Sequence, residues 1–121
     1  MRTSQRDALT PFVTRDGSTI RELAGPAWSA VERQSLAEAT VDPGGETAEH
    51  FHPHTEEIYY FVGGAGRMRL GEQEDVIAAG ACVVIPPGVP HKLWNTGDEA
   101  LVLLCCCVPA YSDDDTVMTG R

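Results

Sequence analysis

Short apolar runs alternate with turn-forming clusters along this chain, and this pattern constrains its fold more than any other feature. The runs are rich in Val, Ile, Leu, Tyr and Phe, recur about every ten residues, and are separated by Gly, Pro and Asp clusters such as Asp42–Gly45 and Pro86–Gly88. Helical periodicity is almost absent, so the pattern predicts an all-β domain. The predicted strands are Thr19–Leu23, Ser35–Val41, His50–His52, Ile58–Val62, Arg67–Leu70, Asp75–Ala78, Ala81–Ile85, His91–Asn95 and Leu101–Val108. So many short strands in one small domain must protect their edges by closing into a barrel or jelly roll.

The chain length of 121 residues suits one such domain. We expect a peripheral N-terminal segment over residues 1–18, a barrel over 19–109 and a C-terminal tail over 110–121. Phe12 or Tyr111 would be the residues of these ends that pack back on the barrel. The acidic triplet Asp113–Asp115 is expected to be a solvated charge run.

Charge and composition exclude several kinds of partner. Acidic residues outnumber basic ones 18 to 9, and the net charge of −9 opposes binding to nucleic acid. No apolar run reaches the roughly 18 residues of a membrane span, and the N-terminus lacks the apolar region of a signal peptide. Cys105, Cys106 and Cys107 are consecutive and cannot form a disulfide framework with Cys82, so we expect free thiols and a cytoplasmic location.

A cluster of histidines carries the strongest chemical signal. His50 and His52 are two residues apart, so on a strand their imidazoles point into one space. Glu57 opens the next strand, and a hairpin returns its carboxylate beside them. His91 follows a rigid segment, Pro86–Pro90, that can present an imidazole inward. The alternative is that these are ordinary surface histidines beside a turn.

The spacing of these residues resembles the two motifs of the cupin family. Gly44, five residues, His50, one residue, His52, four residues, Glu57, six residues and Gly64 match the first motif. Gly80, five residues, Pro86, one residue, Gly88, two residues, His91, three residues and Asn95 match the second, after a separation of fifteen residues that is similar to that of small single-domain cupins. The resemblance implies a jelly-roll β-barrel in which His50, His52, Glu57 and His91 bind one metal ion.

Imidazoles with one carboxylate suit a divalent Fe, Mn, Ni, Cu, Co or Zn ion, and affinity order alone does not choose among these metals. Four protein ligands around an octahedral ion leave two positions for a substrate, or for a substrate and dioxygen. His54 shares the parity of His50 and His52, and is a further candidate ligand or pocket base, but Pro53 and the following turn favour an exposed loop position.

Strand parity predicts the wall of the pocket. Tyr59 and Phe61 share the face of Glu57, and Leu93 shares the face of His91, so these residues and His54 form the predicted substrate pocket. Tyr59 and Glu57 are the candidate catalytic residues. Tyr59 would orient or protonate a bound molecule, although its ring could equally serve as packing.

The opposite faces of the same strands are predicted to point away from the pocket. Trp94 and Tyr60 would then be available for a homodimer contact, by the outer sheet face or an exchanged N-terminal strand. Arg67, Arg69 and Lys92 should also point outward, although an inward arginine would bind a substrate carboxylate. Asn95 is expected to be a structural hydrogen-bonding residue.

Two classes of function fit these features. The first is a small metalloenzyme. We prefer an oxygenase-type (dioxygenase-like) reaction on a small organic acid or aromatic molecule. The competing reactions are those of sugar isomerases, epimerases, lyases and cyclases. The second is a non-catalytic module that binds a metal and a small ligand. Fold alone does not choose between them.

Overall fold

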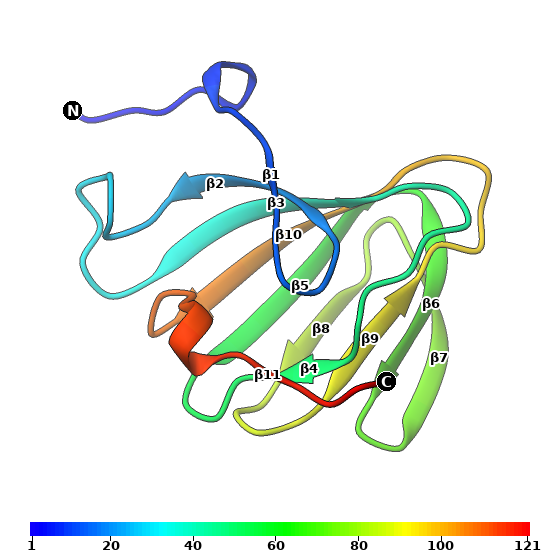
Figure 1. Cartoon of the computed structure of the whole chain (residues 1–121). Helices are drawn as coiled ribbons and strands as arrows, with labels where there is room; N and C mark the ends of the chain where they lie inside the picture. The colour runs from blue at the N-terminus through cyan, green and yellow to red at the C-terminus, as the bar shows by residue number, and fades with distance from the viewer.

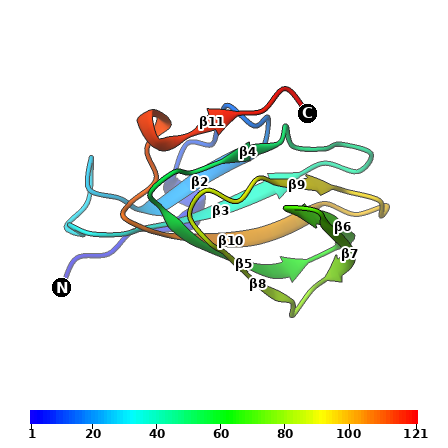
Figure 2. The ribbon, with the colours of Figure 1, turned by 90° about the horizontal axis from the view of Figure 1, so that it is seen from below.

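Two antiparallel β-sheets pack against each other in the computed structural model, which describes residues 1–121 (Figure 1). One sheet has the strand order β1-β2-β3-β10-β5-β8 and the other β11-β4-β9-β6-β7. The strands are β1 (Phe12–Val13), β2 (Thr19–Ala24), β3 (Ser35–Val41), β4 (His50–Phe51), β5 (Glu56–Gly63), β6 (Ala65–Leu70), β7 (Gln73–Ala78), β8 (Cys82–Ile85), β9 (His91–Trp94), β10 (Leu101–Val108) and β11 (Val117–Met118). Figure 2 shows the two layers from below. This arrangement is the predicted jelly-roll barrel.

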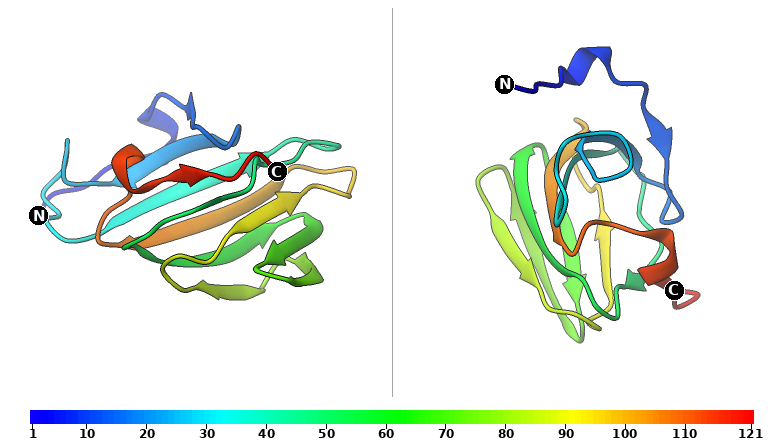
Figure 3. Two further views of the ribbon diagram at one scale, coloured as in Figure 1. Left: turned by 60° about the horizontal axis from the view of Figure 1, so that its bottom comes forward. Right: turned by 90° about the vertical axis from the view of Figure 1, so that its left-hand side faces the viewer.

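Side-chain alternation explains why the sheets face each other. Along β5, Glu57, Tyr59 and Phe61 are buried, whereas the residues between them are exposed. The same alternation along β10 buries Leu101, Leu103, Cys105 and Cys107. The core therefore lies between the two sheets, which curve around a common interior (Figure 3, right).

All nine strands predicted from the sequence are present, with ends shifted by at most two residues. The two short strands β1 and β11 escaped prediction, because two residues are too few to show an alternating pattern. The only helical segments are two three-residue 3-10 turns, Arg6–Ala8 and Asp113–Asp115. Neither has the length and apolar character that a membrane-crossing helix requires.

Both chain ends contribute more to the fold than the sequence indicated. Strand β1 pairs with β2, and the loop after it reaches the interior. Strand β11 pairs with β4, so the C-terminal segment runs along the open side of the second sheet (Figure 3, left). The prediction that the whole triplet Asp113–Asp115 is solvated is wrong for Asp115. Its carboxylate is only 16% exposed and accepts hydrogen bonds from the backbone amides of His54 and Thr55.

The outer face of the second sheet holds a cluster of charged side chains. Arg69 points away from the interior, as predicted, but it is not solvated, because it donates hydrogen bonds to the buried carboxylate of Glu49 at 2.7 and 3.0 Å. Lys92 also points away from the pocket, yet it is only 6% exposed beneath the C-terminal segment, where it donates to the carbonyl oxygen of Arg121. Both cations lie over the ring of Trp94. Trp94 is therefore partly covered by its own chain.

Candidate metal centre

Three imidazoles meet in the interior from two neighbouring strands. His50 on β4 is paired across the sheet with His91 on β9, and His52 follows β4 by one residue. Potential ligand atoms of the three residues lie within 4.8 Å of one another, and all three residues are buried. The sequence spacing and the pairing of β4 with β9 thus produce a compact triad that could hold one metal ion.

Glu57 completes the cluster from the opposite sheet. Its Oε1 lies 3.4 Å from Nε2 of His52 and 3.5 Å from Nε2 of His91. Burial raises the pKa of this carboxyl group, but the two neighbouring imidazoles outweigh burial and lower the pKa to about 2. Glu57 is therefore ionised at neutral pH and is an anionic ligand candidate.

Unpartnered atoms converge at the centre of this cluster. His52 Nε2, His91 Nε2 and Glu57 Oε1 are fully buried and have no hydrogen-bond partner. Buried polar atoms almost always have partners, because an unsatisfied one costs about 1 to 3 kcal/mol. Three of them facing one point fit a bound cation, and the donor set of imidazoles and carboxylate suits a transition metal.

The other ring nitrogen of each histidine is held by the backbone. Nδ1 of His50 donates to the carbonyl oxygen of Ala48 at 3.1 Å. Nδ1 of His91 donates to the carbonyl oxygen of Val89 at 3.0 Å. Nδ1 of His52 donates to the carbonyl oxygen of Asp115 at 3.0 Å. Since a carbonyl oxygen only accepts, each bond places a proton on Nδ1. In the neutral ring Nε2 then carries the lone pair, which is the arrangement found around metal-binding histidines.

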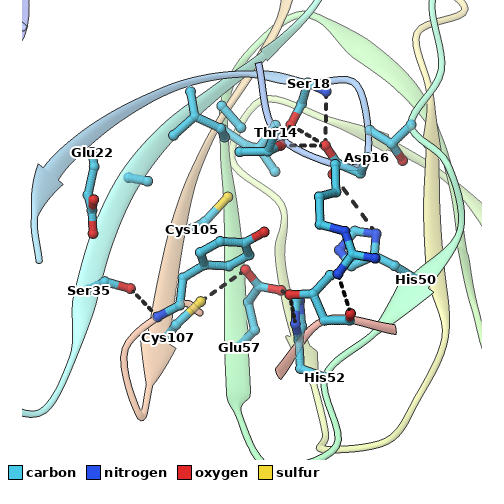
Figure 4. A pocket seen from close by; sticks show the side chains of 18 of the residues that line it. Thr14, Asp16, Ser18, Glu22, Ser35, His50, His52, Glu57, Cys105 and Cys107 are labelled. Carbon is cyan, nitrogen blue, oxygen red and sulfur yellow. Dashed lines mark hydrogen bonds and ion pairs between the residues drawn. The ribbon is translucent and has the colours of Figure 1, made fainter. Parts of the chain in front are cut away.

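Cys107 on β10 contacts the second oxygen of Glu57. Its thiol donates to Oε2 at 3.1 Å (Figure 4). Burial and the neighbouring carboxylate raise the pKa of this thiol, so it stays protonated and acts as a donor. The two oxygens of Glu57 are thus divided between Cys107 and the imidazoles.

A cavity of about 370 Å³ opens beside the imidazoles. Of the residues predicted to line the pocket, Tyr59 and Leu93 do so. The Tyr59 ring lies edge-on to the His91 ring, with centroids 5.7 Å apart. Burial raises the pKa of Tyr59 well above its usual value, so its hydroxyl stays protonated.

The prediction is wrong for Phe61 and His54. Phe61 shares the face of Tyr59, but it is fully buried in the core two residues further along β5 and does not reach the cavity. The side chain of His54 is 82% exposed, and its ring pairs with Asp115 at 2.7 Å. Pro53 and the turn after β4 direct it outward, so His54 lies outside the cluster.

Both chain ends supply cavity residues that the sequence did not place in the pocket. Thr14, Arg15, Asp16 and Ser18 enter from the loop between β1 and β2, and residues 111–113 enter from the segment after β10. Nothing in their local pattern indicates that position, because it depends on contacts across the fold. Asp16 lies close to the imidazoles, with Oδ2 at 4.0 Å from Nδ1 of His50.

Comparison with known proteins assigns this fold and its histidine cluster to a family. The family model described as "Cupin domain" matches residues 37–107, a span that contains His50, His52, Glu57 and His91. The chain belongs to the cupin family.

Similar proteins include an uncharacterised protein and an enzyme. The chain is 43% identical over 113 residues to the uncharacterised protein MJ1618 of Methanocaldococcus jannaschii, covering 93% of this chain and 90% of that protein. It is 33% identical over 84 residues to protein SchB of Streptomyces halstedii, covering 69% and 61% of the two chains. The structure of an oxalate decarboxylase from Lactobacillus farciminis superposes with a TM-score of 0.79 at 26% identity, covering 93% of this chain and 34% of that one.

Proposed function

We propose that this protein is a metal-dependent enzyme of small-molecule metabolism, with one divalent transition metal ion bound by His50, His52, His91 and Glu57. The convergence of three buried, unpartnered ligand atoms is the observation that carries this proposal. The backbone hydrogen bonds to each Nδ1 support it further, because they orient the free nitrogen lone pairs inward. Fe, Mn, Ni, Cu, Co and Zn all suit these ligands.

A bound ion of this kind supplies Lewis-acid or oxygen-activating chemistry. The chain's own residues provide a cavity beside the ion, with a partly apolar wall that includes Tyr59. We take an oxygenase-type reaction as the first candidate, as the sequence predicts. The similarity to an oxalate decarboxylase supports an enzymatic role, although this chain spans only 34% of that enzyme.

A proton-transfer reaction of the isomerase or epimerase type is the second candidate. The position of Tyr59 on the cavity wall, close to the imidazole cluster, supports it. A heavily phosphorylated sugar fits the cavity poorly, since Arg15 is the sole lysine or arginine on its wall. A non-catalytic ligand-binding module remains the alternative outcome of the experiment below. All four cysteines are free, which supports the proposed cytoplasmic location.

The test is metal reloading followed by a screen for turnover. Apoprotein is reloaded separately with each candidate metal, and small aromatic and hydroxylated molecules are screened for oxygen consumption and, by NMR, for isomerisation. The proposal predicts turnover with at least one metal and none in the apoprotein. Stoichiometric metal binding without turnover of any compound would favour the non-catalytic module.

Tyr59→Phe separates catalysis from packing at this position. The substitution keeps the ring and removes only the hydroxyl, so a role in proton transfer predicts a fall in kcat of about 100-fold, with unchanged metal content and Tm. The measurement is steady-state turnover of the substrate that the screen identifies. Unchanged kcat would make Tyr59 a packing residue.

A further inference from the structure

Asp16 is held rigidly at the edge of the candidate metal centre (Figure 4). Its Oδ1 accepts hydrogen bonds from Thr14 Oγ1 at 2.8 Å and from the amide and hydroxyl of Ser18 at 2.9 and 2.7 Å. Its backbone oxygen accepts from the Ala48 amide at 2.8 Å, which ties the loop to the segment that leads into β4. The position of this carboxylate is therefore fixed by the fold.

The second oxygen of Asp16 has no comparable partner. Oδ2 faces Nδ1 of His50 at 4.0 Å, but that nitrogen already donates to the carbonyl oxygen of Ala48. The Asp16 side chain is only 12% exposed and lines the cavity. Oδ2 thus belongs to a mostly buried side chain on the cavity wall and has no hydrogen-bond donor within the protein, so a bound ligand can supply one.

The charges on the cavity wall restrict which donor this can be. The carboxylates on the wall belong to Asp16, Glu22, Glu57 and Asp113. Arg15 is the sole lysine or arginine there, and its Nη1 donates to the carbonyl oxygens of Asp113 and Thr116 at 3.1 and 2.7 Å. An anionic ligand would therefore face these carboxylates with a single cationic side chain, Arg15, besides the metal centre. A hydroxyl group supplies the donor without adding negative charge.

We infer that Asp16 selects the ligand of this cavity, with Oδ2 accepting a hydrogen bond from a hydroxyl group of an uncharged molecule bound beside His50. Ile20, Leu93 and Leu103 on the wall provide the apolar surface for the carbon skeleton. This inference rests on the proposed function of the site. The sequence predicts a small organic acid or aromatic molecule as the substrate. The inference narrows this prediction to uncharged compounds that carry a hydroxyl group.

The discriminating variant is Asp16→Asn. The amide oxygen can take over the three hydrogen bonds of Oδ1, while an NH₂ donor replaces the Oδ2 acceptor and the negative charge is lost. A hydroxyl-bearing ligand should then bind more weakly, because a hydrogen bond to a charged group is removed. An anionic ligand should bind more tightly, because a repulsive charge is removed.

The experiment compares two probes by isothermal titration calorimetry on zinc-loaded protein: benzyl alcohol, an uncharged hydroxyl compound, and phenyl phosphate, an anion of similar size. We expect Asp16→Asn to weaken benzyl alcohol binding by about tenfold or more and to tighten phenyl phosphate binding. Thr14→Val is the matched control, since it removes one hydrogen bond to Oδ1 and leaves Oδ2 in place. It should shift both affinities little and in the same direction.

Opposite shifts for the two probes support the inference. Failure of benzyl alcohol to bind the wild-type protein, an unchanged benzyl alcohol affinity in Asp16→Asn, or shifts of the same sign for both probes would overturn it. Zinc content is measured on every sample, so loss of the metal centre is distinguished from loss of ligand selection. Opposite shifts in a protein that turns over no substrate would retain the inference and reject the proposed enzymatic function.

Discussion

At the scale of single residues, the two oxygens of Glu57 have different partners, and this difference predicts how metal affinity changes when one partner is removed. Oε1 faces His52 and His91, while Oε2 accepts a hydrogen bond from Cys107. Removing a partner that orients a metal ligand typically weakens metal binding by about 10- to 100-fold. Cys107→Ala should therefore lower metal affinity by about tenfold, measured by calorimetric titration of the apoprotein with zinc.

Two further variants show whether the Cys107 effect comes from the hydrogen bond. Cys107→Ser keeps a donor of similar size and should restore most of the affinity. Cys106→Ala alters a neighbour that points to the opposite face and should bind zinc like the wild type. Equal affinities in Cys107→Ala and wild type would show that the thiol does not position Glu57.

Sequence reasoning reached the four residues of the candidate metal centre but not the residues around them. His50, His52, Glu57 and His91 could be predicted because local parity and two motifs record their spacing. Asp16 and Cys107 could not be predicted, because their roles arise from contacts between residues distant in the sequence. The contrast between Tyr59 and Phe61 has a similar cause: parity gives the face of a strand, but depth in the core decides whether a side chain reaches the cavity.

At the scale of elements, Asn95 joins three parts of the fold at the end of β9. Its Nδ2 donates to the carbonyl oxygens of Val41 and Glu99 at 2.9 and 2.8 Å, and its Oδ1 accepts from the Gly97 amide at 3.0 Å. The residue is 3% exposed, and its contacts agree with the structural role expected from the sequence. The turn between β9 and β10 is therefore fixed to the end of β3.

Asn95→Ala should destabilise the protein by about 2 to 3 kcal/mol, because buried backbone groups lose their partners. Urea denaturation of the apoprotein measures the free energy of unfolding. Asp98→Ala, at an exposed position of the same turn, is the control and should change that free energy by about 0.5 kcal/mol or less. A similar small change in Asn95→Ala would contradict the proposed role.

The long strands could be predicted from the alternation of their side chains, whereas the short strands at the chain ends could not. Strands β3, β5 and β10 have seven or eight residues each, which is enough to display alternation. Strands β1 and β11 have two residues each and form because the barrel offers them unpaired edges. The ends were consequently predicted to be peripheral, although one supplies Asp16 and the other the carbonyl oxygen that orients His52.

At the scale of the whole molecule, the outer face of the first sheet carries an apolar surface. Cross-strand pairing places Leu36, Cys106, Ile58 and Val84 in one row over β3, β10, β5 and β8. Tyr60 in the neighbouring row is 45% exposed. A face of this kind fits the homodimer predicted from the sequence, whereas Trp94 lies on the other sheet beneath its own Arg69 and Lys92.

Light scattering coupled to size exclusion should therefore give twice the chain mass of 13.0 kDa at micromolar concentration. Ile58→Glu places a charge in the middle of the apolar row and should yield a monomer. Val76→Glu, at a position 69% exposed on the other sheet, should leave the dimer intact. A monomeric wild-type protein would contradict the dimer.

The metal content of histidine variants tests the central claim most directly. Wild-type protein, His50→Ala/His52→Ala and the control His54→Ala are each reloaded with zinc, dialysed and measured by elemental analysis. We predict one ion per chain in the wild type and in His54→Ala, whose altered ring lies outside the cluster, and no retained ion in the double variant. Stoichiometric zinc in a folded double variant would contradict the assignment of the metal centre.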